Sequence, residues 1–213
     1  MTVRLAIFDF DGTLANTYPL FLSALHELAL KHRFRHPAPD EQHKLRGMGA
    51  AQVLRELQLP LWRVPAVSAD YRRIMHERIA EIELFPGIAD ALQTLADHRI
   101  ELALATSNTL DNVQAVLGNA LIERFTALEC GTSLFGKPQR LRHILKDAQA
   151  TPRETIYVGD EIRDADAAHR AGVAFGAVAW GYTSIDALLA KQPERVFDAP
   201  ADLCSLVHAR HAT

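Results

Sequence analysis

The 213-residue sequence predicts an α/β fold, namely a doubly wound, mainly parallel sheet with a small all-helical domain inserted after the first strand. Three observations support this prediction. The apolar run at residues 5–8 has the length of a buried strand. Residues 15–82 show no strand pattern, whereas strand-like and helix-like segments alternate beyond residue 82. Such alternation is typical of parallel strands joined by right-handed crossovers, with helices on both faces of the sheet.

The inserted segment is expected to form three helices. From Pro19 onward, apolar residues recur at steps of three and four, as on one face of a helix. Residues 31–40 are basic and interrupted by proline, so we expect a loop there. A second helix is expected to end before Pro60, and a third to begin at Asp70 and to continue to about Ile82.

The rest of the chain supplies the remaining strands of a Rossmann-like sheet. Residues 100–105 are apolar at five of six positions, as expected of a strand that is covered on both faces. Further strands are predicted at residues 127–130, 155–158 and 173–179, with helices between them. We therefore predict that residues 1–14 and 83–213 form a core domain and that residues 15–82 form a helical cap.

Composition narrows the range of partners. The 23 basic residues nearly balance the 26 acidic ones. The protein therefore lacks the strong positive charge that would indicate nucleic acid or an anionic membrane as a partner. No apolar run approaches the roughly 20 residues needed to span a bilayer, and no signal peptide is recognisable. We expect a cytoplasmic protein that acts on a small molecule. The sequence leaves open whether it is a monomer or a dimer.

Asp9 and Asp11 stand directly after the first predicted strand, in the run Phe8-Asp9-Phe10-Asp11-Gly12. Burying two carboxylates is costly unless a metal ion, hydrogen bonds or a proton compensates for the charge. An acidic loop without a function is the alternative, but it would not need two aspartates at the end of a core strand. The aspartate pair therefore indicates a functional site at the end of this strand.

Polar residues also follow the other predicted strands. They are Thr106, Ser107 and Asn108 after the second strand, Lys137 after the third, and Asp160, Glu161 and Asp164 after the fourth. The carboxyl ends of parallel strands meet at one edge of the sheet, where ligands bind in such folds. Carboxylates such as Asp9, Asp11 and Asp160 suit Mg²⁺, while hydroxyl, N–H and lysine groups suit a phosphoryl group. Together they describe phosphoryl transfer through an aspartyl-phosphate.

These motifs resemble those of the haloacid dehalogenase superfamily, and in particular its phosphoglycolate-phosphatase-like branch. The resemblance runs from Leu5 to about Trp180. It is carried by Asp9-x-Asp11-Gly12-Thr13-Leu14, then Thr106, Lys137 and Gly159-Asp160-x-x-x-Asp164. It implies a Rossmann-like core with a helical cap, Mg²⁺ as the cofactor, and hydrolysis of a small phosphate monoester.

The resemblance also implies roles for the carboxylates. Asp9 would be the nucleophile and a metal ligand. Asp11 would serve as general acid and then general base, with its backbone carbonyl on the metal. Asp160 would complete the metal site, while Glu161 and Asp164 would orient metal-bound water. For Asp164, capping of its own helix is an equally good interpretation.

The phosphate group would be held by Thr106 together with the backbone N–H groups of Ser107 and Asn108. Lys137 would neutralise both the nucleophile and the transferred group. Taken alone, Thr106 could simply end a strand and Lys137 could be a solvated loop residue. The aspartate pair is what makes the functional interpretation the better one.

Substrate choice is expected to lie in the cap, around Lys44, Arg46 and Gly47. Arg46 could meet a substrate carboxylate, although a solvated basic helix end is a slightly better interpretation. The family's usual Asp-Ser after the first motif is Asn16-Thr17 here, which weakens any transfer of a particular substrate.

Three alternative functions remain open at this point. One is a sugar-phosphate mutase, and another is a phosphonatase, which would need a Schiff-base lysine such as Lys44. The third is a phosphate-binding protein that is not catalytic. A dehalogenase is disfavoured, because it would not be expected to carry an acid–base group at Asp11.

Overall fold

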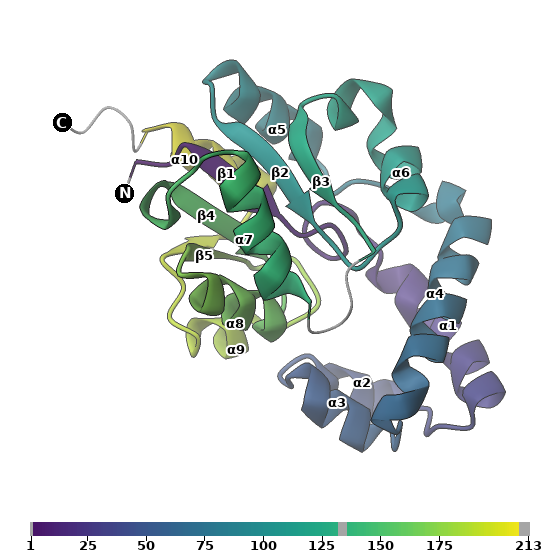
Figure 1. Ribbon diagram of the computed structural model, residues 1–213. Coiled ribbons are helices and arrows are strands. Elements are labelled where there is room, and N and C mark those ends of the chain that lie inside the picture. The colour runs from purple at the N-terminus through teal and green to yellow at the C-terminus, as the bar shows by residue number, and fades with distance from the viewer. Residues whose placement is uncertain (1, 132–135, 209–213) are drawn as a thin grey trace.

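The computed structural model describes residues 2–131 and 136–208 and contains a six-stranded, fully parallel sheet (Figure 1). The strand order is β3-β2-β1-β4-β5-β6. The strands are β1 (Leu5–Phe8), β2 (Glu101–Ala105), β3 (Phe125–Glu129), β4 (Thr155–Gly159), β5 (Ala174–Val178) and β6 (Arg195–Phe197). The predicted fold class is confirmed. Residue 1, residues 132–135 and residues 209–213 of the predicted core range lie outside the described residues.

The chain reverses its direction of travel across the sheet at β1. It moves outward from β1 to β2 and β3, and then returns to place β4 on the other side of β1. Ile7 consequently lies opposite Ala103 of β2 and Tyr157 of β4. The carboxyl end of β1 is thus at a topological switch point, where folds of this class bind ligands.

Helices cover both faces of the sheet (Figure 1). Because side chains alternate along a strand, Ala6 and Phe8 of β1 pack on one layer of helices, and Leu5 and Ile7 pack on the other. The first layer contains α5 (Ile88–Asp97), α6 (Leu110–Ile122) and α10 (Ser205–His208), and the second contains α7 (Lys137–Asp147), α8 (Ile162–Ala171) and α9 (Ile185–Leu189). No helix in the described ranges is long and apolar enough to cross a membrane.

The segment between β1 and β2 is helical, and within its described residues it adds no strand to the sheet. It contains α1 (Tyr18–His32), α2 (Pro39–Leu45), α3 (Ala50–Glu56) and α4 (Val64–Glu77), with short 3-10 helices at Leu61–Arg63 and Ile79–Glu81. The other 3-10 helices are Pro152–Glu154 and Pro200–Cys204. Figure 1 shows α1–α4 lying beyond the end of the sheet. They share an apolar cluster of their own that includes Leu25, Phe34 and Ile74. The division into core and cap stays a prediction.

Three features differ from the prediction. The inserted segment contains four α-helices instead of three, because α2 begins at Pro39, inside the predicted loop at residues 31–40. The third inserted helix was expected to start at Asp70, but α4 starts at Val64. Pro65 occupies its first turn, where the missing proline N–H has no helical partner to lose. The sixth strand, Arg195–Phe197, was not predicted, because three residues are too few to show an alternating pattern.

Asp70 joins α4 to α1 instead of starting a helix, and this leads to a stability prediction. Its carboxylate accepts hydrogen bonds from Lys31 Nζ at 2.8 Å and His32 Nε2 at 2.6 Å. These hydrogen bonds, Lys31 first, lower the pKa of Asp70. A lowered carboxyl pKa stabilises the folded state above the unfolded-chain value of about 3.9, and the effect is lost as pH falls through the folded value.

We expect Asp70→Asn to lower the free energy of unfolding at pH 7 by no more than about 1 kcal/mol, the range for solvent-screened pairs. The difference from the unmodified protein should shrink as the pH falls below about 3.9 and through the lower pKa of Asp70 in the folded protein. Urea unfolding at several pH values measures it, with the exposed Asp198→Asn as the matched control. A loss that is equal at all pH values would contradict the ion-pair explanation.

Candidate active site

Asp9 follows β1 directly and lies at the switch point of the sheet. Its side chain is 1% exposed. Oδ1 accepts a hydrogen bond from the Phe10 N–H at 2.8 Å, and Oδ2 accepts one from Lys137 Nζ at 2.5 Å. Burial raises the pKa of Asp9, and the nearby Asp164 carboxylate adds to this, while Lys137 opposes both. The carboxylate is therefore confined in a site where added positive charge would stabilise it.

Lys137 lies between two buried carboxylates. It is the first residue of α7, and only 2% of it is exposed. Besides Asp9, its Nζ contacts Asp164 Oδ1 at 2.6 Å, and the Tyr157 hydroxyl donates to that same oxygen at 3.1 Å. Burial alone would lower the pKa of Lys137, but Asp164 and Asp9 outweigh it and raise the pKa. Lys137 is thus a buried cation in direct contact with Asp9, not a solvated loop residue.

Asp160, at the end of β4, is held by two donors. Thr13 Oγ1 donates to Oδ1 at 2.7 Å, and the Tyr182 N–H donates to Oδ2 at 2.8 Å. Burial raises the pKa of Asp160 well above its usual value, and the charges of Glu161, Asp164 and Asp9 raise it further. The loops after β1 and β4 approach closely because residue 12 is glycine. Its φ is +76°, and a Cβ there would collide with the Asp160 carboxylate.

Asp9, Asp160 and Asp164 form a buried carboxylate cluster, with one oxygen of each within 4.8 Å of the others. Hard oxygen donors gathered at this spacing fit Mg²⁺, which would offset the cost of burying them together. The predicted ligand set was Asp9, Asp11 and Asp160, with Asp164 outside it. The structure places the Asp164 carboxylate in the cluster and does not place the Asp11 side chain there. The ligand atom predicted for Asp11 was its backbone carbonyl.

Asp164 differs from its neighbours in its pKa. Burial alone would raise the pKa, but Lys137 and Arg163 outweigh it and lower the value. Oδ2 also accepts a hydrogen bond from the Glu161 N–H at 3.0 Å, at the start of α8. Asp164 therefore caps its helix and at the same time contacts Lys137, so the two interpretations of this residue are compatible.

Asp11 lies next to this cluster, and its environment suits proton transfer. The Asn108 side-chain amide donates to its two carboxylate oxygens at 3.2 and 3.3 Å. Burial raises the pKa of Asp11 to about 6, although the Thr17 side chain opposes the shift. A carboxyl group with a pKa near the working pH can both donate and accept a proton efficiently.

The predicted phosphate cradle after β2 is arranged differently from expectation. Thr106 is fully buried, and its hydroxyl oxygen accepts a hydrogen bond from the Asn108 N–H at 3.0 Å. Such local hydroxyl-to-backbone bonds are typical of the turn that threonine forms. The Asn108 N–H, predicted to hold phosphate, is therefore engaged within the protein. The Asn108 side chain instead contacts Asp11, while Ser107 is half-buried beside the cavity described below.

Of the three residues predicted to choose the substrate, Arg46 lines the cavity beside Asp11, described below, whereas Lys44 and Gly47 do not. Arg46 donates from Nε to the Tyr182 carbonyl and from Nη2 to the Gly181 carbonyl, both at 2.9 Å. Its guanidinium also lies 5.7 Å from the centre of the Tyr18 ring. Arg46 thus joins the inserted helices to the loop after β5. Lys44 and Gly47 are exposed to solvent.

Several residues near the site were not predicted from the sequence. Arg163 donates from Nη2 to Glu161 Oε1 at 2.7 Å, and its charge lowers the pKa values of both Asp9 and Asp11. Its place inside the Gly-Asp-x-x-x-Asp motif could have indicated it. Thr17 and Tyr182, whose hydroxyl groups are 2.5 Å apart, carry no local signal because 165 positions separate them.

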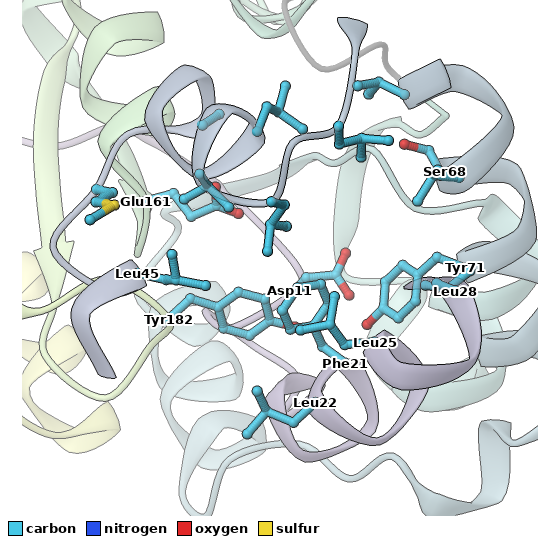
Figure 2. Close-up of a pocket in the computed structure, with 18 of the residues that line it drawn as sticks. Asp11, Phe21, Leu22, Leu25, Leu28, Leu45, Ser68, Tyr71, Glu161 and Tyr182 are labelled. Carbon is cyan, nitrogen blue, oxygen red and sulfur yellow. The ribbon is translucent and has the colours of Figure 1, made fainter. Parts of the chain in front are cut away.

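A cavity of about 300 Å³ opens beside Asp11, between the inserted helices and the loops at the sheet edge (Figure 2). Ser107, Glu161, Arg163 and Tyr182 line the end nearest the sheet. Most of the remaining lining comes from apolar side chains of α1, α3 and α4. Figure 2 shows the Asp11 carboxylate and the Tyr71 hydroxyl pointing into this space. The site thus places a buried carboxylate cluster near a partly open cavity that can hold a small molecule.

Comparison with known proteins identifies the family to which the chain belongs. A phosphoglycolate phosphatase of Agrobacterium fabrum is 34% identical over 214 residues, which cover 91% of this chain and 88% of that protein. One from Synechococcus elongatus is 29% identical over 202 residues, or 94% and 95% of the two chains. CbbY from Rhodobacter sphaeroides, crystallised in complex with phosphate, superposes with a TM-score of 0.73 at 25% identity, covering 94% of this chain and 96% of that one. The family of haloacid dehalogenase-like hydrolases matches residues 6–178. The chain therefore belongs to the haloacid dehalogenase-like hydrolases, and is a phosphomonoester hydrolase similar to their phosphoglycolate phosphatases.

Proposed function

We propose that this protein is a Mg²⁺-dependent phosphatase that hydrolyses a small phosphate monoester through an aspartyl-phosphate on Asp9. One observation carries the proposal. The buried Asp9 carboxylate contacts the Lys137 ammonium at 2.5 Å and shares a cluster with Asp160 and Asp164, directly beside Asp11 and its cavity. Groups suited to act as nucleophile, cation, metal ligands and acid–base group thus lie close together, which supports the proposal.

In the first step, a carboxylate oxygen of Asp9 attacks phosphorus, and the bond between phosphorus and the alcohol oxygen breaks. Asp11 gives its proton to the departing alkoxide. In the second step, the deprotonated Asp11 takes a proton from a water molecule that attacks the aspartyl-phosphate, which frees inorganic phosphate and restores Asp9. The pKa of about 6 for Asp11 suits both roles near neutral pH.

The other residues are proposed to balance charge and to orient the reacting groups. When bound, Mg²⁺ supplies positive charge for the carboxylates and the phosphate oxygens. Lys137 neutralises Asp9 through its contact with Oδ2. Thr106 and the Ser107 N–H are proposed to bind phosphate oxygens, with Arg163 as an additional cation. Asn108 orients the Asp11 carboxylate through its side-chain amide. We also propose that residues 15–82 act as a cap that excludes water from the transfer step.

The alternative functions gain little support. A phosphonatase would need a lysine in the cavity, but Lys44 is exposed and lies outside the lining of the cavity. A mutase would return the phosphoryl group to a sugar instead of releasing it, so a measurement of released phosphate distinguishes it from a phosphatase. A protein without catalysis would have no use for the shifted pKa of Asp11 beside a buried nucleophile.

Metal removal tests the proposal directly. We expect the protein to release inorganic phosphate from simple esters such as p-nitrophenyl phosphate and 2-phosphoglycolate in the presence of Mg²⁺. Removing Mg²⁺ with EDTA should lower the rate by about 100-fold or more, since the ion contributes several kcal/mol of charge stabilisation. Added Mg²⁺ should restore it. Ca²⁺ is the matched control, because it has the same charge but prefers more ligands at longer distances.

Released phosphate also separates a phosphatase from a mutase. A rate unaffected by EDTA would contradict the metal requirement. A broad panel of esters that yields no phosphate at all, with Mg²⁺ binding still measurable, would instead favour the binding protein that is not catalytic.

A further inference from the structure

The cavity beside Asp11 is larger than a two-carbon leaving group needs. Its volume is about 300 Å³. The glycolate part of phosphoglycolate contains only two carbons and three oxygens. A cavity of this size is at the lower end of the range for ordinary small-molecule pockets. The space extends from Asp11 into the apolar cluster of the inserted helices.

Aromatic rings form the wall of the cavity nearest Asp11. Phe21 of α1 packs edge-on against the Tyr71 ring, with centroids 5.7 Å apart, and lies 5.9 Å from the Tyr182 ring. Tyr18 lies 5.0 Å from Tyr182 on the same side. Leu25 and Leu28 add apolar surface, and Figure 2 shows their side chains beside these rings. Such a wall favours flat or branched apolar groups.

The charges that line the cavity offer little to a substrate carboxylate. Among the described lining residues there are two acids, Asp11 and Glu161, and two arginines, Arg46 and Arg163. Arg46 already donates to two carbonyl groups, and Arg163 is paired with Glu161. Both arginines of the lining are therefore already engaged by protein groups.

Two residues that line the cavity, Tyr71 and Arg163, each hold one polar atom that is buried behind the accessible surface. The Tyr71 hydroxyl and Arg163 Nε are buried without a hydrogen bond of standard geometry among the described residues. The Tyr182 hydroxyl lies near enough to Tyr71 to act on its pKa. Because neither atom is accessible from the cavity, an apolar leaving group would not change how they are paired.

From these observations we propose that the cavity holds the leaving group of the substrate, and that this group is an apolar, ring-sized alcohol instead of glycolate. The inference rests on the proposed function, because it takes the phosphate group to lie at Asp9. The ester oxygen then lies next to Asp11, and the carbon skeleton extends past the aromatic wall toward α3 and α4. Specificity comes from burial of apolar surface, and the paired arginines make no contact with the leaving group.

The test compares three primary alkyl phosphates, so that leaving-group reactivity differs little between them. They are 2-naphthylmethyl phosphate, ethyl phosphate and 2-phosphoglycolate. We expect kcat/KM for the naphthylmethyl ester to exceed that of each of the others by about 10-fold or more, as one filled apolar pocket allows.

Two variants fill the cavity from different helices. Ser68→Leu on α4 and Ala50→Leu on α3 should each reduce the preference for the naphthylmethyl ester over ethyl phosphate by about 5-fold or more. Ala66→Leu is the matched control, because Ala66 is exposed on α4 and does not line the cavity. It should leave the preference unchanged.

The outcomes separate the two claims. If ethyl phosphate and 2-phosphoglycolate are hydrolysed but the naphthylmethyl ester is not preferred, the inference about the leaving group is wrong and the proposed phosphatase function stands. The inference is equally wrong if both filling variants keep the full preference. If none of the three esters nor p-nitrophenyl phosphate releases phosphate, the proposed function fails and the inference fails with it.

Discussion

Replacing Asp9 by asparagine is expected to lower kcat for phosphate release by about 10⁴-fold or more, because an amide cannot replace the carboxylate as a nucleophile. The fold should be retained. An asparagine of the same size keeps one acceptor oxygen, which can serve either the Phe10 N–H or Lys137 Nζ, while Lys137 keeps its contact with Asp164. Burial raises the pKa of Asp9, which means that the folded protein disfavours its charge. Losing that charge therefore offsets part of the cost of the lost hydrogen bond.

Phosphate release and urea unfolding should be measured on the same Asp9→Asn preparation. Asp198→Asn, which changes an exposed aspartate, is the control and should match the unmodified protein in both measurements. If Asp9→Asn kept activity within a few-fold of the unmodified protein, Asp9 could not be the nucleophile. If it lost activity only together with its fold, the result would speak for a structural role.

The second large effect is expected at Lys137. Replacing it by methionine keeps most of its length but leaves the carboxylates of Asp9 and Asp164 buried without their cation. Removing one partner of a buried ion pair typically costs about 3–5 kcal/mol of unfolding free energy. Urea unfolding in EDTA measures this cost, since a bound divalent ion would mask it. Phosphate release with Mg²⁺ should fall as well.

The same helix offers a control for this variant. Lys146 is exposed near the end of α7, so Lys146→Met should change the unfolding free energy by no more than about 0.5 kcal/mol. Adding Asp164→Asn to Lys137→Met removes one of the two uncompensated charges and should recover part of the lost stability. A Lys137→Met protein as stable as the unmodified one would contradict the buried ion-pair arrangement.

Much of the fold was predictable because each strand or helix shows its pattern of apolar residues within a short stretch of sequence. The runs at residues 5–8 and 100–105 are β1 and β2 almost to the residue, since a strand buried on both faces is continuously apolar. The start of α4 was predicted wrongly, because Asp70 resembles a helix-capping residue while its carboxylate in fact bonds to α1. The strand at Arg195–Phe197 has no pattern of its own and is defined by its pairing with β5.

The sequence by itself determined that Asp9, Lys137 and Asp160 would meet. Each follows a strand or begins the next helix, and parallel strands end at one edge of a sheet. Only the tertiary structure decided the rest. The Asn108 contact to Asp11, the Arg46 contacts to Gly181 and Tyr182, and the cavity between helices and loops all join segments far apart in the chain. Such contacts depend on how the inserted helices pack on the sheet edge, and no periodicity or motif encodes that packing locally.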